Sequence, residues 1–287
     1  MVDFIELLKS FFVGIVQGIT EWLPISSTGH IILVNDLFPL KVSVDFWSMF
    51  SVVIQLGSIL AVLVLYFSRL WPLEKKEGKI GVKKSAVGIW TKVIVACIPA
   101  AVLGIFIDEW LEGMLYEDEM TVAFVGAMVI AIALIVYGVA FIIIEHKNKN
   151  KTFEVNTVEE LSYKKALGIG LFQSLALIPG TSRSGSTIMG ASLLGVSRTV
   201  AAEFSFFLAV PVMFGASALK LAKFFLKGNM FTAPELLILA VGCITAFVVS
   251  LAAIKFLMNF VRRHSFAPFG VYRIILGIVV IIYFVLR

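Results

Sequence analysis

Two short segments concentrate the residue types that can do chemistry. The first, residues 17–30, reads QGITEWLPISSTGH, and the second, residues 179–187, reads PGTSRSGST. Each places hydroxyl groups and glycines just before an apolar stretch in which a helix is expected to resume. The N-terminus of a helix has free backbone N–H groups and a positive dipole, which suit an anion. Two such ends, together with Arg183, whose planar fork matches phosphate bidentately, predict a phosphate-binding cavity.

The first segment also carries groups that can move a proton or attack phosphorus. Ser27 and His30 are three residues apart and share a face of the resumed helix. A hydroxyl beside an imidazole is an activated-nucleophile arrangement, and histidine itself can accept a phosphoryl group. Glu21 is a candidate general acid or base, or a ligand of a divalent cation shared with the phosphate. Gln17, one helical turn earlier, offers that cation a neutral oxygen.

Blander interpretations of these residues compete with the catalytic ones. Glu21 and Arg183 can simply neutralise each other as a structural ion pair, because an isolated charge at membrane depth is costly. His30 can be a hydrogen-bonded interior histidine. The clustering of hydroxyl groups in both segments favours an anion-binding site over the ion pair alone.

The amino-acid composition indicates whether these segments belong to a soluble protein or to a membrane protein. The chain has 287 residues, 60% of them apolar and 15% charged, and its mean hydropathy is +1.00. These values exclude an ordinary soluble enzyme. The apolar stretches are continuous and do not alternate, so we expect an all-α polytopic membrane protein and no β-barrel. No basic stripe with interleaved aromatic residues lies outside the loops, so a nucleic-acid partner is not expected. Asp3 and Glu6 stand where a signal peptide has basic residues, so no cleaved targeting segment is expected.

The hydropathy pattern predicts six spanning helices and two interrupted regions. A span needs about 20 apolar residues. The six windows are residues 46–68, 87–107, 120–144, 203–220, 235–255 and 268–286. The interrupted regions are 4–40 and 164–198, and each break falls near the middle of the membrane. Basic residues place the loops around 69–92, 147–165 and 255–273 in the cytoplasm. Arg273 is one of the basic residues that assign the last of these loops. The acidic loop 108–119 is expected outside.

These sides require both interrupted regions to be re-entrant hairpins that enter the membrane from opposite faces. The region 4–40 then enters from outside, the region 164–198 from the cytoplasm, and both termini lie outside. Only the lysines at 220, 223 and 227 violate the charge rule. A shift of 156 residues superposes the two breaks, placing Gln17 on Gln173 and Ser26 on Ser182. We therefore expect one membrane domain, 1–287, built from inverted repeats 1–145 and 160–287, with the site at the midplane.

At these residues the sequence resembles the bacterial undecaprenyl-diphosphate phosphatases linked to bacitracin resistance. GIVQGITEWLPISSTGH resembles that family's Glu/Gln-x-x-x-Glu motif running into Pro-Ile-Ser-Ser-Thr-Gly-His. PGTSRSGST resembles its Pro-Gly-x-Ser-Arg-Ser-x-x-Thr motif, and VVIQLGSILAV, IPAAVLG and FGVYRIILG extend the resemblance over nearly the whole chain. Position 17 is often Glu in the family and is Gln17 here, which argues against an obligatory base or charged metal ligand at this position.

The resemblance implies an enzyme that hydrolyses undecaprenyl diphosphate to the monophosphate and phosphate. This reaction recycles the lipid carrier for peptidoglycan at the outer face of the bacterial cytoplasmic membrane. The positions matching catalytic residues are Glu21, Ser27, His30 and Arg183. The positions matching phosphate-contacting residues are Ser26, Thr28, Ser182, Ser184 and Thr187, beside Arg183. The family is associated with a divalent cation, Mg²⁺ or Ca²⁺, for which Glu21 and Gln17 are the candidate ligands. A polyprenyl diphosphate, membrane lipids and a second copy of the chain in a homodimer are the expected partners.

A transporter or flippase for a phosphate-bearing substrate or lipid is the main alternative. Inverted repeats and broken helices are features of transporters. The Ser27/His30 pair favours the enzyme, because transport needs no nucleophile. A single fold can also serve both hydrolysis and transport.

Overall fold

The computed structural model describes residues 3–76, 79–114, 119–149 and 151–286, with the side chains of 76 and 105–123 left aside. In these residues the protein is almost entirely helical, and six helical spans are long and apolar enough to cross a membrane. The spans are Val44–Leu65, Lys84–Gly104, Phe124–Lys147, Arg198–Leu226, Ala233–Val261 and Ala267–Leu286. The predicted all-α polytopic fold is therefore confirmed, with each span within a few residues of its hydropathy window.

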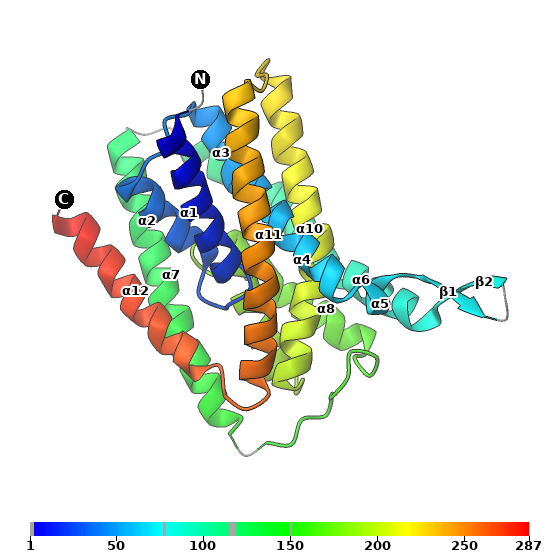
Figure 1. Ribbon diagram of the computed structural model, residues 1–287. Helices are drawn as coiled ribbons and strands as arrows, with labels where there is room; N and C mark the ends of the chain where they lie inside the picture. The colour runs from blue at the N-terminus through cyan, green and yellow to red at the C-terminus, as the bar shows by residue number, and fades with distance from the viewer. Residues whose placement is uncertain (1–2, 77–78, 115–118, 150, 287) are drawn as a thin grey trace.

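The spans belong to helices that Figure 1 labels in chain order. The first span is broken at Ile54 into α3 (Val44–Val53) and α4 (Gln55–Leu65). The others are α6 (Lys84–Met114), α7 (Glu119–Lys147), α10 (Arg198–Leu226), α11 (Ala233–Val261) and α12 (Ala267–Leu286). The basic loop after α4 holds the short helix α5 (Phe67–Leu70) and an antiparallel hairpin of β1 (Leu73–Lys76) and β2 (Lys79–Val82).

The two interrupted regions form helical hairpins of the same design. The first consists of α1 (Phe4–Thr20) and α2 (Ser27–Leu37). The second consists of α8 (Tyr163–Gln173), the 3₁₀ turn η1 (Ser174–Leu177) and α9 (Arg183–Leu193). The residues before α2 and α9, Ser26 and Ser182, both have φ of 73° and are the non-glycine residues with positive φ in the described chain. Their hydroxyls accept hydrogen bonds from the backbone N–H groups of Gly29 and Gly185.

Equivalent helices of the two halves run in opposite directions. In Figure 1, α4 descends from α3 while α10 climbs toward the loop before α11, and α7 descends while α12 climbs. Both chain ends lie in the upper half of that view. These directions are the ones that an inverted repeat requires.

Glycines allow the entering helix of each hairpin to lie directly against a span of the other half. A Cβ on Gly14 of α1 would stand 2.7 Å from the carbonyl oxygen of Gly242 on α11. At the equivalent position of the second repeat, a Cβ on Gly170 would stand 2.2 Å from the carbonyl oxygen of Ala96 on α6. Small residues let membrane helices approach closely enough for backbone contact.

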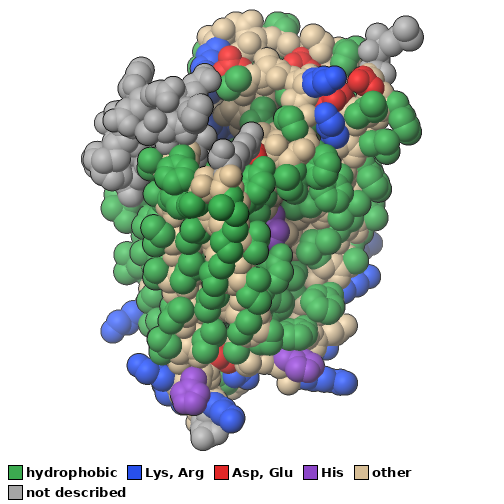
Figure 2. Space-filling view, turned by 90° about the vertical axis from the view of Figure 1, so that its left-hand side faces the viewer, with side chains coloured by type: hydrophobic (Ala, Val, Ile, Leu, Met, Phe, Trp, Pro, Cys, Tyr) green, Lys and Arg blue, Asp and Glu red, His purple; other side chains and the backbone are tan. Residues whose placement is uncertain are grey.

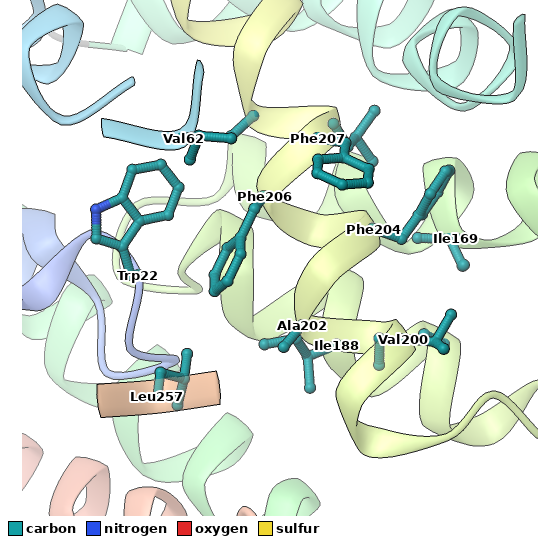
Figure 3. Packing of buried hydrophobic residues seen from close by; sticks show 14 of the residues in the cluster. Trp22, Val62, Ile169, Ile188, Val200, Ala202, Phe204, Phe206, Phe207 and Leu257 are labelled. Carbon is teal, nitrogen blue, oxygen red and sulfur yellow. The ribbon is translucent and has the colours of Figure 1, made fainter. Parts of the chain in front are cut away.

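Aromatic and aliphatic side chains between the two hairpins build the main core. Figure 3 shows Trp22, in the first break, beside Phe206 of α10, and their rings meet edge to face with centroids 5.2 Å apart. Both side chains are fully buried. Helix α10 thus packs the first break against the second hairpin. On the face that Figure 2 shows, hydrophobic side chains form a broad band across the middle of the molecule, and most charged side chains lie toward its two ends.

Arg273 corrects one part of the sequence interpretation. It does not mark a cytoplasmic loop, because it lies within α12 and its side chain is completely buried. Its guanidinium donates hydrogen bonds to the carbonyl oxygens of Pro24 (3.2 Å), Gly180 (3.1 Å) and Thr181 (2.9 Å). A loop carbonyl inside a membrane protein needs such a donor. Arg273 therefore joins the two breaks from a third element.

The contact at Gly170 generates a stability prediction. We expect Gly170→Ala to lower the free energy of unfolding by about 1–3 kcal/mol, because its Cβ is forced against backbone, which cannot yield as a side chain can. Thermal unfolding of the protein in detergent measures the loss. Gly126→Ala in α7 is the matched control, since a Cβ there has no neighbour within 4 Å. That variant should be neutral or slightly more stable, because alanine favours a helix interior. Equal stability of the two variants would contradict the packing account.

Candidate active site

A partly open cavity of about 220 Å³ lies where the two breaks meet. Both hairpins line it, and α4, α6 and α10 complete the wall. Its lining residues are Glu21, Ser27, Thr28, Gln55, Ala100, Gln173, Ala176, Leu177, Ile178, Pro179, Gly180, Ser182, Arg183, Ser184, Val212, Met213 and Ala216. The structure thus brings together residues from both sequence motifs, which are about 160 positions apart in the chain.

Glu21 is the centre of the polar network in this cavity. Its Oε2 accepts hydrogen bonds from Gln17 Nε2 at 2.9 Å and from Ser27 Oγ at 3.0 Å. Its Oε1 accepts from Arg183 Nη2 at 3.0 Å. Both carboxylate oxygens are therefore engaged, and the side chain is only 5% exposed. The proton acceptor for the Ser27 hydroxyl in this arrangement is the carboxylate of Glu21.

Arg183 crosses from the second repeat to reach Glu21. Its Nη1 donates to the backbone carbonyl oxygen of Ser205 on α10 at 2.8 Å, and this second hydrogen bond fixes the orientation of the guanidinium group. Its Nε is buried and has no hydrogen-bond partner among the described residues. The ion pair considered as the structural alternative is thus present, at 3.0 Å. It coexists with a donor on Arg183 that no protein group uses.

The predicted phosphate-binding hydroxyls fall into two groups. Thr28, Ser182 and Ser184 line the cavity beside Arg183. Ser184 Oγ also lies 3.2 Å from Ser182 Oγ. Ser26 and Thr187 support this wall, Ser26 by capping α2. Thr187 Oγ1 forms hydrogen bonds with the carbonyl of its own helix at Arg183 and with Ser205 Oγ on α10. The first group can contact a ligand directly, and the second holds the helix N-termini in place.

His30 does not point toward Ser27. Its Nδ1 is 2.7 Å from the carbonyl oxygen of Ser26, and its Nε2 is 2.7 Å from the hydroxyl of Tyr272 on α12. The His30 and Tyr272 rings are stacked with an interplanar angle of 4°. Both ring nitrogens are therefore occupied, and among the described side chains no hydrogen bond joins Ser27 to His30.

A second, mainly apolar cavity of about 500 Å³ lies on the other side of the first break, and His30 faces it. Its lining residues are Val16, Ile19, Thr20, Leu23, Ile25, His30, Phe260, Pro268, Phe269 and Tyr272. The break is thus a wall with Glu21 and Ser27 on one side and His30 on the other. Helical spacing placed Ser27 and His30 on one helix, but the contact with α12 decides where the imidazole points.

Several residues of the site were not assigned to it from the sequence. Gln173 lines the cavity, and Ser205 holds Arg183 from α10. The signal for Gln173 is its match with Gln17 in the repeat. Nothing in the sequence pairs Tyr272 with His30, because that contact depends on how α12 packs against α2.

The donor set can be tested for a divalent cation. No cluster of three or more His, Cys, Asp or Glu side chains occurs in the described part of the chain. One carboxylate, Glu21, is present, and Gln17 Oε1 is a buried oxygen without a hydrogen-bond partner among the described residues. Mg²⁺ is commonly held by one or two carboxylates together with the phosphates of a substrate. These residues therefore fit a cation that shares a phosphate-bearing ligand and do not form a complete cage by themselves.

Comparison with known proteins agrees with this geometry. Residues 10–279 match the family described as bacitracin resistance protein BacA. An undecaprenyl-diphosphatase of Enterococcus faecalis is 53% identical over 281 residues, covering 98% of each chain. One of Acetivibrio thermocellus is 54% identical over 280 residues, again with 98% of each chain covered. An undecaprenyl-diphosphatase 1 of Clostridium acetobutylicum is 51% identical over 285 residues and 99% of each chain. The chain, with both of its motifs at one cavity, therefore belongs to the bacitracin resistance protein BacA family.

Proposed function

We propose that this protein is an undecaprenyl-diphosphatase, which hydrolyses undecaprenyl diphosphate to undecaprenyl phosphate and phosphate and so recycles the lipid carrier of cell-wall synthesis. One observation carries the proposal. Relatives with this name share half of the sequence over nearly the full length, and the chain's own matching motifs meet at one cavity that holds a carboxylate, a serine hydroxyl and an arginine. A serine hydroxyl, a carboxylate base and a cation can together hydrolyse the phosphoanhydride bond of a diphosphate.

The second repeat is suited to bind the diphosphate. The N-terminus of α9 carries free backbone N–H groups next to Ser182 and Ser184, and Arg183 is its first helical residue. A helix N-terminus attracts an anion, and an arginine strengthens the attraction with charge-assisted hydrogen bonds. The N-terminus of α2, at Ser27 and Thr28, supplies the same kind of donors from the opposite side of the cavity. The reacting phosphate then lies between two helix ends.

The first repeat is suited to carry out the chemistry. Ser27 Oγ attacks the terminal phosphorus, forming a new O–P bond, while the bond from that phosphorus to the bridging oxygen breaks. Glu21, which already accepts the hydrogen bond of the Ser27 hydroxyl, takes its proton. Undecaprenyl phosphate leaves, and water then hydrolyses the phosphoserine to release phosphate. Direct attack by His30 is the competing version, and it requires the ring to leave Tyr272 and turn into the cavity.

We also propose a divalent cation, Mg²⁺ or Ca²⁺, as a cofactor that arrives with the diphosphate. Glu21 and Gln17 Oε1 would hold it. The cation, when bound, supplies positive charge that offsets the charge of the diphosphate. Arg183 remains necessary in this scheme, because it orients the phosphate through directional N–H donors.

The orientation in the membrane follows from the loop charges. We propose that the site faces the outer side of the bacterial cytoplasmic membrane and that both termini lie outside. The basic loops after α4, after α7 and between α11 and α12 support cytoplasmic positions for those ends of the spans. The repeats 1–145 and 160–287 then have opposite orientations.

A transporter or flippase for a phosphate-bearing lipid is the alternative, favoured by the two broken hairpins that meet at a central cavity.

The enzyme and the transporter differ in their product, because only the enzyme releases phosphate. Detergent-solubilised protein given undecaprenyl diphosphate should release inorganic phosphate, and Arg183→Ala should reduce that release by about 100-fold or more, because it removes the positive charge that holds the phosphate. A colorimetric phosphate assay measures this. A transporter in detergent releases none.

The same assay tests the cation. Treatment with EDTA should lower phosphate release, and added Mg²⁺ or Ca²⁺ should restore it. Undiminished release after thorough chelation would exclude the cation.

The choice of nucleophile can be read from variants and from the trapped enzyme. Ser27→Ala should lower turnover by about 100-fold or more, because no other hydroxyl donates to Glu21 in the described structure. Mass spectrometry of acid-quenched enzyme should find the phosphoryl group on the peptide that contains Ser27. Full turnover by a well-folded Ser27→Ala variant would eliminate the serine mechanism. His30→Ala should also lower turnover, through loss of the contacts that hold Ser26 and α12.

The membrane orientation is tested with an epitope tag at each end of the chain. Both tags should be accessible to protease in intact spheroplasts, because the loop charges place the ends outside and the six crossings leave both ends on the same side. Protection of either tag would contradict the hairpin topology.

A further inference from the structure

We infer that Gln173 is a substrate-binding residue, whose side-chain amide donates a hydrogen bond to a phosphate oxygen of the diphosphate in the cavity between the hairpins. This inference rests on the proposed function and deepens it. It names a contact on the second repeat that neither sequence motif contains. Gln173 lies at the end of α8, before the turn η1 that leads into the second break.

The state of the side chain is the first observation. Gln173 is 2% exposed and lines the cavity beside Arg183. Neither its Nε2 nor its Oε1 has a hydrogen-bond partner among the described residues. A buried amide without partners destabilises a protein, so native proteins rarely retain one without a use. Because Gln173 lines the cavity, a ligand that enters can supply the missing partner.

The repeat supplies the second observation. Gln17, the equivalent residue, donates through Nε2 to the carboxylate of Glu21, four residues later. Four residues after Gln173 stands Leu177, which also lines the cavity. The second repeat has kept the amide and has an apolar residue where the first has a carboxylate. The partner that occupies the amide in one half is thus missing in the other.

The charges in the cavity indicate which ligand atom replaces that partner. Glu21 makes the first-repeat side anionic, although Arg183 offsets its charge. A phosphate would avoid a second carboxylate, and at Leu177 there is none. Beside the α9 N-terminus, Gln173 adds an N–H donor without adding charge. A phosphate oxygen accepts from such a donor, while the amide oxygen can accept from a protonated phosphate or from water.

Replacement of Gln173 distinguishes a substrate-binding residue from a purely structural one. Gln173→Leu keeps the size of the side chain and removes both polar atoms. Because the lost amide has no protein partner, this variant should melt at the same temperature as the wild type or higher. It should nevertheless raise KM for undecaprenyl diphosphate about tenfold, the effect of one hydrogen bond to a charged group. We expect kcat to change less than about threefold.

Ser174→Ala is the matched control. Ser174 is the next residue along the chain, is also buried, and donates to the carbonyl oxygen of Gly170 at 3.3 Å. Its loss should lower the melting temperature slightly and leave KM unchanged. Gln173→Glu provides a second test of the donor, since it retains an acceptor but adds negative charge beside the phosphate. We expect it to raise KM more than Gln173→Leu does.

A binding measurement separates this inference from the proposed function. Inorganic pyrophosphate should raise the melting temperature of the wild-type protein, and Gln173→Leu should weaken that shift. If the wild type releases phosphate and Gln173→Leu has an unchanged KM and an unchanged pyrophosphate shift, the inference is overturned and the function stands. If the wild type releases no phosphate, the function fails, and the pyrophosphate shift alone decides whether Gln173 binds the anion. A lower melting temperature of Gln173→Leu with unchanged KM would assign the residue a structural role.

Discussion

The structure depends on satisfying backbone polar groups at two interruptions in the middle of a membrane protein. Water is scarce at that depth, so each freed N–H or carbonyl needs an internal partner. Arg273 supplies donors to carbonyl oxygens of both breaks, at Pro24, Gly180 and Thr181. Ser26 and Ser182 cap the helices that follow. Because one guanidinium joins both breaks, a shift of either hairpin away from α12 would leave that hairpin's carbonyl oxygens unpaired.

The same constraint creates the site. If all backbone N–H and carbonyl groups of a break formed hydrogen bonds within their own hairpin, no group would remain to bind a ligand. Here the carbonyls are held by α12 and the serine caps use part of the N–H groups, which leaves helix N-termini facing a cavity. Glu21 and Arg183 then pair across the repeats at 3.0 Å. Removal of one partner would leave the other as an uncompensated buried charge, which is far more costly than loss of the pair. Stability and the proposed anion binding therefore depend on the same residues.

The sequence was sufficient for the spans, the hairpins and the convergence of both motifs, because hydropathy and charge depend on local composition. It was insufficient where a side chain is placed by a distant helix. Arg273 was grouped with loop charges, since its buried carbonyl partners cannot be seen in the sequence. His30 is turned by Tyr272, which is 242 residues away. Two of the three lysines that violate the charge rule have partners on α3: Lys220 donates to Ser48, and Lys227 pairs with Asp45.

Duplication alone would give a cavity with two equal halves, which is a poor arrangement for hydrolysis. Two carboxylates at the positions of Glu21 and Leu177 would repel a diphosphate from both sides. The two halves instead differ where chemistry requires it. The shift that superposes the repeats places Ser27, the proposed nucleophile, opposite Arg183, the proposed phosphate-binding cation. Each is the first residue of its resumed helix and so occupies the same place relative to the cavity. In the proposed mechanism, divergence at a few equivalent positions assigns attack to one half and most of the binding to the other, and the shared backbone geometry directs both at one phosphate.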